Sequence, residues 1–322
     1  MSSEFTMFLL DLFCGCGGFT QGFRQDSPVF SIALGVDQDS YALNAYQMNF
    51  PHTKTLQCDI RTLHSLELLE LLNHQYPDII LASPPCEAFS GANPKRMSRG
   101  YNQLFEDERG RLVLDAIRLI IDLEPRVFLI ENVSQLASSP LQALIRYEFK
   151  RSPYPLIYFN RLEAVNHGVP SFRKRVFISN IPFNSPSNIP IVTVKDAFMD
   201  LPDPLDDIYQ EILHIPFKMA KKVNQLQSGG ALVYYKGSRR STLRNYIRLD
   251  WEHPSPTVMG KSRFIHPSEP RFCTVREHAR LMSFPDSFHF SGPIEQQYNQ
   301  IGESVPPALS SFLAEQLLKE SL

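Results

Sequence analysis

The stretch Asp78–Cys86, with the sequence DIILASPPC, decides the fold because an apolar run ends there in two prolines and a cysteine. A second apolar run, Val127–Ile130, is followed directly by Glu131, 45 residues after Cys86. Both runs predict buried strands, and the apolar spacing within Leu112–Leu123 predicts a helix between them. Such a crossover makes the strands parallel and brings their carboxyl ends to one edge, where open α/β sheets bind ligands. We therefore expect Cys86 and Glu131 to face the same pocket.

The first half of the chain repeats this alternation of strands and helices. A glycine-rich turn, Cys14–Gly18, separates the first apolar run from a helix that begins near Phe19, and a second helix is expected over Ser40–Asn49. The further strands that we predict are Met7–Phe13, Ile32–Asp37, Thr55–Asp59 and Arg175–Ser179. This order predicts an α/β fold with a doubly wound, mostly parallel sheet.

The composition changes after Ile181, where prolines break the chain into short pieces and the alternation is lost. We expect a catalytic and cofactor-binding domain over residues 1–181 and a second, smaller domain over residues 182–275. The segment 276–322 regains helical spacing at Leu309, Leu313 and Leu317. We expect this segment to return to the first domain.

Bulk composition excludes several classes of protein. The chain has 322 residues, 43% of them hydrophobic, which is enough for a sizeable core in one large domain or in a large and a small one. Its five cysteines include no C-x-x-C pair, so neither a disulfide framework nor a zinc site is expected, and we predict no metal. Met7–Phe13 is too short to span a membrane and no basic segment precedes it. These features predict a soluble, cytoplasmic protein.

The charge is small overall but uneven along the chain. The formal net charge is −2, whereas residues 217–263 hold ten basic and two acidic side chains, a local excess of 8 positive charges. The segment is either a solvated loop or a surface that contacts phosphates. Within it, aromatic and basic residues are mixed in a way that suits contacts with a nucleic-acid backbone and its bases, for which we single out Lys236, Arg239 and Arg240. The alternative is a small β-rich lobe whose tyrosines, Tyr234 and Tyr235, form a core.

A cofactor site is predicted at the glycine-rich turn. Gly15, Gly17 and Gly18 let the backbone approach a ligand closely, and Asp37, at the end of the second strand, can accept bonds from ribose hydroxyls. The turn lacks the third spaced glycine of G-x-G-x-x-G, which disfavours a nicotinamide or flavin cofactor. Phe13 is either an adenine-stacking ring or a core aromatic. Asp59 either accepts from an adenine amino group or caps the next helix.

A reactive centre is predicted around Cys86. The two prolines before it fix the backbone, and a thiolate at this place could add to an electrophilic ring carbon if nearby positive charge lowers its pKa. Glu131 could hydrogen-bond a ring nitrogen of the substrate. Arg173 and Arg175 could supply the positive charge, or one of them could pair with a surface acid. The alternative for Cys86 is a small buried hydrophobic residue.

Six ordered motifs give the chain a resemblance to the DNA cytosine-5 methyltransferases. The resemblance runs from Asp11 to the C-terminus, except for residues 183–246, which fall where that family holds its variable target-recognition region. The motifs are Asp11–Gly18 (DLFCGCGG), Pro84–Cys86 (PPC), Glu131–Val133 (ENV), Gly168–Pro170 with Arg173–Arg175 (GVP and RKR), Arg276–Leu281 (REHARL) and Gly302–Pro306 (GESVP).

This resemblance implies a Rossmann-like enzyme that transfers a methyl group from S-adenosylmethionine to carbon 5 of a cytosine flipped out of double-stranded DNA. Cys86 would attack carbon 6, Glu131 would hold the ring, and Arg175 would contact the flipped base with Arg173 close by. The residues that match the donor-binding positions are Phe13, Gly15, Gly17, Asp37, Asp59, Ile60, Ser304 and Val305. The implied enzyme is monomeric and belongs to a prokaryotic restriction-modification system, in which a cognate endonuclease need not touch it.

The sequence departs from the family pattern at three positions. Glu87 stands where the family usually has glutamine, and we expect a base such as Lys95 or Arg96 to neutralise it. Ser171 replaces another glutamine, and Glu303 stands where asparagine is usual. None of these changes removes the predicted nucleophile or its acid partner.

Two other functions stay open at this level. One is an RNA cytosine-5 methyltransferase with the same fold, although the Cys-Phe-Thr signature of the transfer-RNA branch is absent, since Cys273 and Thr274 follow Phe272 here. The other is a non-catalytic nucleic-acid-binding relative. Cys86 together with Glu131 argues against it, whereas Glu87 and Glu303 are its only support.

Overall fold

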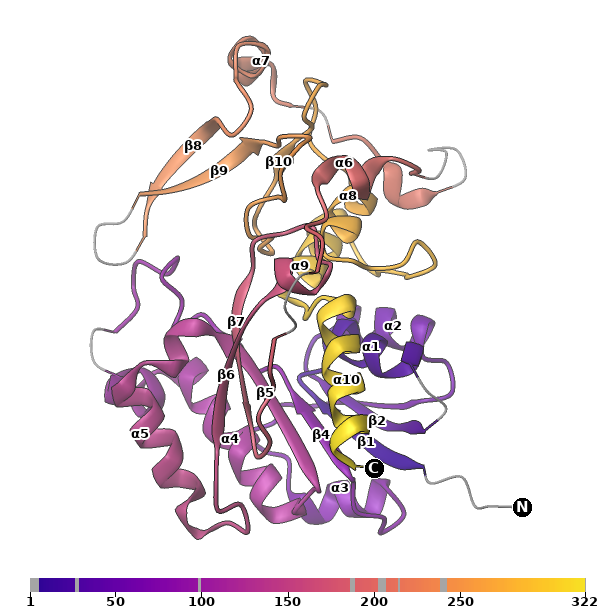
Figure 1. The fold of residues 1–322 in the computed structure, drawn as a ribbon, viewed down its shortest axis with the longest axis vertical. Coiled ribbons are helices and arrows are strands. Elements are labelled where there is room, and N and C mark those ends of the chain that lie inside the picture. The colour runs from indigo at the N-terminus through magenta and orange to yellow at the C-terminus, as the bar shows by residue number, and fades with distance from the viewer. Residues whose placement is uncertain are drawn as a thin grey trace.

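A central sheet of seven strands organises the larger lobe of the molecule (Figure 1). A computed structural model describes residues 6–26, 29–97, 100–185, 189–201, 207–213, 215–237 and 242–321. The strand order is β3-β2-β1-β4-β5-β7-β6. The strands are β1 (Met7–Leu12), β2 (Phe30–Asp37), β3 (Lys54–Gln57), β4 (Ile79–Ala82), β5 (Val127–Val133), β6 (Tyr158–Glu163) and β7 (Lys174–Ser179).

Helices cover both faces of this sheet because alternate side chains of its strands point to opposite sides. Leu10 and Ile80 pack in one core cluster with residues of α4, whereas Leu9 and Ile79 pack in another with residues of α1. The helices of this part are α1 (Gly18–Asp26), α2 (Ser40–Asn49), α3 (Ser65–Leu71), α4 (Glu108–Leu123) and α5 (Ser139–Glu148), with short turns η1 (Asn102–Glu106), η2 (Ser134–Ala137), η3 (Phe149–Arg151) and η4 (Ala164–His167). The predicted doubly wound sheet is confirmed.

The end of β5 differs from the prediction. The sequence places the end of this strand at Ile130, but β5 continues to Val133 because β7 pairs with it in antiparallel register, with Glu131 opposite Phe177 and Val133 opposite Arg175. The partner of β7 on its other side, β6, was not predicted, because its residues are mostly half-buried and show no clear alternation. Glu131 is therefore held inside a sheet rather than in a loop.

The C-terminal helix α10 (Pro307–Ser321) lies along α1 (Figure 1). Leu309, Leu313 and Leu317 are buried in the core cluster that also holds Phe19 of α1. The helices approach closely because Gly22 has no side chain: a Cβ atom there would lie 2.3 Å from the backbone nitrogen of Ser311.

We use the term small lobe for α6, α7 and the strands β8–β10, which lie above the central sheet in Figure 1. Its sheet has the order β10-β9-β8, and its core joins Phe198 and Ile247 to Leu43 and Tyr46 of α2. The elements after β7 are α6 (Val194–Phe198), η5 (Ile208–Gln210), α7 (Phe217–Asn224), β8 (Ala231–Lys236), β9 (Thr242–Arg248), β10 (Phe264–Ile265), α8 (Val275–Leu281) and α9 (Ile294–Glu303). Within the described ranges, the search for a helix able to cross a bilayer finds none.

Candidate active site

The Pro84–Cys86 segment leaves β4 at the carboxyl edge of the sheet, by which we mean the edge where β1, β2, β4 and β5 end. Ala82, the last residue of β4, is paired in register with Ile130 of β5. Asn132 is fully buried, and its side-chain nitrogen donates a hydrogen bond to the carbonyl oxygen of Pro84 at 3.0 Å. Sequence analysis did not single out Asn132, although an asparagine in a buried strand is a signal because a buried amide needs a partner.

Cys86 is half-buried, and burial raises the pKa of its thiol above the ordinary value. The positive charges of Arg175 and Arg173 act in the opposite direction, while the carboxylates of Glu131 and Glu303 raise the pKa further. The two arginines thus lower the pKa of this thiol, as expected of nearby positive charge, but its net pKa is raised. The physical reason is that the loss of solvent disfavours the thiolate more than the arginines favour it.

Glu131 and Arg175 form an ion pair beside this cysteine, across the β5–β7 pairing. The Nε atom of Arg175 lies 2.9 Å from the Oε1 atom of Glu131, and their side chains are 11% and 7% exposed. Oε1 itself is buried without a hydrogen bond, because the contact does not follow the direction of the N–H group. The pair therefore brings together the two residues expected to meet the substrate, and neither arginine of the predicted pair is lost to a surface acid.

Arg173 has a different environment, since its side chain is buried and donates to three backbone carbonyls. The Nη1 atom donates to Val258 at 2.9 Å and to Gly302 at 3.0 Å, and the Nη2 atom donates to Ser304 at 2.9 Å. Burial lowers the pKa of this guanidinium to about 9. Arg173 thus links the start of β7 to a segment of the chain before β10 and to the end of α9.

The glycine-rich turn and Asp37 form one unit. The backbone N–H of Gly15 donates to the Oδ2 atom of Asp37 at 2.8 Å, and the N–H of Asp39 donates to Oδ1 at 2.9 Å. Gly17 has a φ of +96°, and a Cβ atom there would lie 2.3 Å from the ring of Phe50. Burial raises the pKa of Asp37. Only glycine fits at Gly17 of this turn. The hydrogen bond from Gly15 holds Asp37 and the turn together.

The other predicted donor-site residues lie around this unit. A carboxylate oxygen of Asp59 accepts from the Nε atom of Arg61 at 3.0 Å, and this hydrogen bond lowers the pKa of Asp59. The residue before the next helix is His64, so Asp59 does not cap that helix. Ile60 is buried, whereas Phe13 is half-buried and has a φ of +57°.

The segment after α9 completes the same site from the C-terminal part of the chain. The hydroxyl of Ser304 donates to the carbonyl of Gln300 at 2.6 Å and lies 3.2 Å from the sulfur of Cys16. Val305 is buried, and a Cβ atom at Gly18 would lie 2.7 Å from its carbonyl oxygen. By contrast, a Cβ atom at Gly15 would meet no atom within 4 Å. The turn is packed on one side, at Gly17 and Gly18, and leaves space on the other, at Gly15.

Glu87 pairs with a base that sequence analysis did not predict. Its carboxylate lies 2.9 Å from the Nη1 atom of Arg109, and Arg109 also contacts Asp107 at 3.0 Å. Lys95 and Arg96 were the expected partners, but the Nη1 atom of Arg96 donates to the carbonyl of Phe89 instead. No sequence signal links Glu87 to Arg109, because the loop that joins them follows no regular period.

Ser171, which stands where the family usually has glutamine, connects two segments of the chain. Its side chain is buried, and its hydroxyl donates to the carbonyl oxygen of Pro256 at 3.2 Å. Ser171 also forms an isolated parallel bridge with Ser255. The residue therefore connects the segment before β7 to the chain between β9 and β10.

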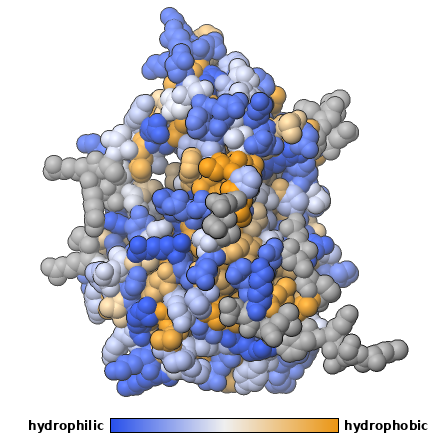
Figure 2. Space-filling model, viewed as in Figure 1, coloured by the Kyte–Doolittle hydropathy of each residue, from blue (hydrophilic) through white to orange (hydrophobic). Residues whose placement is uncertain are grey.

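Of the three predicted DNA-contacting residues, the structure describes only Lys236, which lies on the small lobe. Lys236 is exposed at the end of β8, whereas Arg239 and Arg240 lie outside the described residues. Tyr234 is 61% exposed, so the alternative in which it forms a core is wrong for that residue. Figure 2 shows hydrophilic side chains over the tip of the molecule where α7 lies, and the exposed lysines of this helix are Lys218, Lys221 and Lys222.

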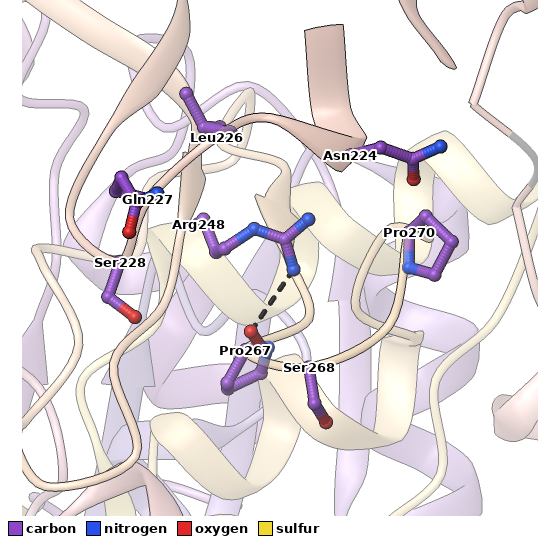
Figure 3. A pocket seen from close by; sticks show the side chains of 8 residues that line it. All are labelled: Asn224, Leu226, Gln227, Ser228, Arg248, Pro267, Ser268 and Pro270. Carbon is purple, nitrogen blue, oxygen red and sulfur yellow. Dashed lines mark hydrogen bonds between the residues drawn. The ribbon is translucent and has the colours of Figure 1, made fainter. Parts of the chain in front are cut away.

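A cavity of about 300 Å³ in the small lobe contains none of the predicted site residues (Figure 3). Arg248 in its wall donates to the carbonyls of His266, Pro267 and Val223 at 2.8, 3.1 and 2.9 Å. Its guanidinium therefore links the loop at His266 and Pro267 to the end of α7. The cavity is lined by Asn224, Leu226, Gln227, Ser228, Arg248, Pro267, Ser268 and Pro270.

The mostly parallel sheet, with a glycine-rich turn after its first strand and a cysteine after its fourth, is consistent with the methyltransferases that bind S-adenosylmethionine. The family model described as C-5 cytosine-specific DNA methylase matches residues 7–319. The chain belongs to this family and is a DNA cytosine-5 methyltransferase.

Named relatives agree with this assignment. M.MjaORF1200P of Methanocaldococcus jannaschii, which carries the name of a type II methyltransferase, is 40% identical over 97% of this chain and 98% of its own length. The type II methyltransferase M1.HphI of Haemophilus parahaemolyticus is 34% identical over 96% of this chain and 86% of its own length. The chain is thus similar to modification enzymes of restriction-modification systems.

Solved structures share the fold. An Escherichia coli protein described as a DNA modification methyltransferase encoded within a prophage has a TM-score of 0.76 and 26% identity, covering 98% of this chain and 99% of that chain. The Schizosaccharomyces pombe Dnmt2 methyltransferase has a TM-score of 0.69 and 16% identity, over 98% and 99% of the two chains. The second likeness concerns the fold alone.

Proposed function

We propose that Cys86 is the nucleophile of this methyltransferase and that Glu131 and Arg175 hold the target cytosine. The observation that carries the proposal is the buried ion pair of Glu131 and Arg175, at 2.9 Å, beside a cysteine at the carboxyl edge of the sheet. Glu131 is held by the β5–β7 register, and the Cys86 segment is held by the hydrogen bond from Asn132 to Pro84. Groups fixed in this way need no rearrangement when charge develops on the ring.

The chemistry assigned to these residues begins with addition of the Cys86 thiolate to carbon 6 of cytosine. Glu131 would hydrogen-bond the third ring nitrogen and the exocyclic amine, and Arg175 would contact the base while balancing the charge of Glu131. Carbon 5 then acts as a nucleophile toward the methyl group. Because the target atoms are inaccessible in stacked DNA, the base must be flipped into the pocket.

S-adenosylmethionine is proposed as the cofactor that supplies this methyl group. Asp37 would accept bonds from its ribose hydroxyls, with Gly15 and Gly17 permitting close approach of the backbone and Phe13 stacking on the adenine. Asp59 and Ile60 would flank the adenine. Ser304 and Val305 would contribute from the C-terminal segment.

The substrate proposed is double-stranded DNA, recognised by residues 182–275, with residues 1–181 and 276–322 forming the catalytic domain. Lys236, Arg239 and Arg240 would contact the DNA backbone. Arg173 would keep the active site in position through its hydrogen bonds to backbone carbonyls. We propose a monomeric enzyme in the cytoplasm of a prokaryotic cell, where a cognate endonuclease of the same system needs no contact with it. Its type II relatives support this role.

The experiment that tests the proposal compares the wild-type chain with Cys86→Ser. Labelled S-adenosylmethionine is supplied with either duplex DNA or transfer RNA, and bisulfite sequencing of host DNA identifies the methylated site. We expect incorporation into duplex DNA by the wild type and none by the variant, which should still bind DNA. Appreciable turnover by Cys86→Ser would refute the nucleophile, and incorporation into transfer RNA without DNA would refute the substrate.

A further inference from the structure

The proposed reaction ends with a step that needs a base. After the methyl group has reached carbon 5, that carbon still carries its original hydrogen, and carbon 6 is bonded to the Cys86 sulfur. A base must take the proton from carbon 5, so that the C–H electron pair forms the C5–C6 double bond and the C6–S bond breaks to release the thiolate. The family pattern has amides at positions 87 and 303, whereas this chain has two carboxylates.

Glu303 is fixed beside the active site by the backbone on either side of it. It is the last residue of α9, and the carbonyls of its neighbours Gly302 and Ser304 accept hydrogen bonds from Arg173 at 3.0 and 2.9 Å. Arg173 lies two residues before Arg175, the partner of Glu131. The charge of Glu303 acts on the thiol of Cys86. The backbone around Glu303 is therefore anchored by the residue that directly precedes β7, the strand that carries Arg175.

The carboxylate of Glu303 is available for a proton. Among the described residues it has no hydrogen bond and no ion pair, and its Oε1 atom lies 3.1 Å from the place a Cβ atom would take at Gly260. The loss of solvent around the carboxyl group raises the pKa of Glu303, although the residue as a whole stays exposed. The charged groups that face it are Glu87, Asp37 and Asp39, which raise this pKa further, Lys261, which lowers it, and the Cys86 thiol and Arg173.

Glu87 is the less suitable of the two carboxylates, although it directly follows the nucleophile. Arg109 lies 2.9 Å from it, so this carboxylate is already engaged in an ion pair. A base must be free to reach the proton that it takes, which favours the carboxylate of Glu303, for which the described residues offer no partner. The contrast selects Glu303 as the acceptor and leaves Glu87 to influence it by its charge.

We propose that Glu303 is the base that accepts the carbon-5 proton after methyl transfer. This assignment rests on the proposed function of Cys86. In the step, Glu303 changes from carboxylate to carboxylic acid, the C5–C6 double bond forms, and Cys86 leaves as the thiolate. The exposed side of Glu303 then releases the proton to water, so the step needs no further reactant.

The test follows the two halves of the reaction separately in a single turnover. The substrate is duplex DNA with tritium at carbon 5 of the target cytosine, mixed with methyl-labelled S-adenosylmethionine. Glu303→Gln should still transfer the methyl group and form a denaturant-stable protein–DNA adduct, but release tritium at least about 100-fold more slowly than the wild type. Glu315→Gln, an exposed change on α10, should behave as the wild type.

The outcomes separate this proposal from the one on which it rests. If the wild type neither methylates DNA nor forms an adduct, the proposed function fails. If the wild type does both and Glu303→Gln releases tritium at the same rate, only the assignment of the base is overturned. A merely structural role for Glu303 would slow adduct formation together with tritium release, and this outcome also overturns the assignment.

A second measurement keeps Glu303 in place, in case its own variant does not fold. The base must be deprotonated, so tritium release should rise with pH through the pKa of Glu303. Because the charge of Glu87 raises that pKa, Glu87→Gln should move the rising limb to lower pH. If the rise of the tritium-release rate with pH stays in place or moves to higher pH in Glu87→Gln, the proposal is contradicted.

Discussion

The carboxyl edge of the sheet and the β8–β9 hairpin of the small lobe hold their charged residues in opposite ways. At the edge, Glu131, Arg173 and Arg175 are buried or nearly so, and each has defined partners on other elements. On the hairpin, Lys236 and Tyr234 project into solvent. The comparison teaches that the charged residues proposed for the chemistry are fixed by long-range contacts, whereas the side chains proposed for recognition are exposed to solvent.

The largest effect is expected from breaking the buried pair. Glu131→Gln removes the acid that we propose holds the cytosine and leaves the Arg175 charge buried without its partner. Turnover should fall by about 100-fold or more, and the free energy of unfolding should drop by about 3 kcal/mol. Turnover is measured by methyl incorporation and stability by urea denaturation.

The matched control is the neighbouring ion pair on the same strand. Lys174 of β7 lies 2.5 Å from Glu163 of β6, but both side chains are well exposed. Glu163→Gln should change stability by less than about 1 kcal/mol and leave turnover unchanged. Equal effects of the two substitutions would show that burial does not distinguish the two pairs.

Arg173→Met gives the next largest effect, because it removes three hydrogen bonds from a charged donor to buried carbonyls. We expect a loss of about 3 kcal/mol in the free energy of unfolding. Turnover should fall as well, since the chain around Ser304 loses its anchor. Arg161→Met, which removes one hydrogen bond at a more exposed site, is the control and should cost about 1 kcal/mol. If the two variants lose the same stability, Arg173 is not the link described above.

These two arginines show how far the sequence alone leads. The strand–helix–strand pattern placed Cys86 and Glu131 at one edge, because the crossover rule depends only on local periodicity. The different roles of Arg173 and Arg175 could not be predicted. Both belong to one motif, and their partners, Ser304 and Glu131, come from segments far away in the chain.

The same limit applies to Glu87 and to the end of β5. The pairing of Glu87 with Arg109 depends on how an irregular loop returns to the start of α4, which no period encodes. The extension of β5 to Val133 depends on antiparallel pairing with β7, a non-local contact. The strands and helices with a clear local period were thus predicted, whereas β6, the end of β5 and the side-chain partners across elements were not.

The pH dependence of Cys86 alkylation is a smaller effect with a definite sign. Burial raises the pKa of the thiol, and the thiolate is the reactive form, so iodoacetamide should react with a midpoint above that of an ordinary cysteine. Arg175 lowers this pKa and Glu131 raises it. Arg175→Met should therefore move the midpoint to higher pH, and Glu131→Gln should move it to lower pH. Shifts in the same direction for both variants would contradict the charge arrangement at the edge.

The smallest effect per residue is expected on the hairpin. Lys236→Ala should weaken binding to duplex DNA about equally for all sequences, and it should reduce the slope of log affinity against log salt by about 1. The same is expected for Arg239→Ala and Arg240→Ala, while turnover on saturating DNA should stay near the wild-type value. Lys319→Ala on α10, where the side chain pairs within its own helix, is the control. An unchanged salt slope in these three variants would mean that the substituted side chains are merely solvated. The small lobe would then have to contact DNA through other basic residues, such as the exposed lysines of α7.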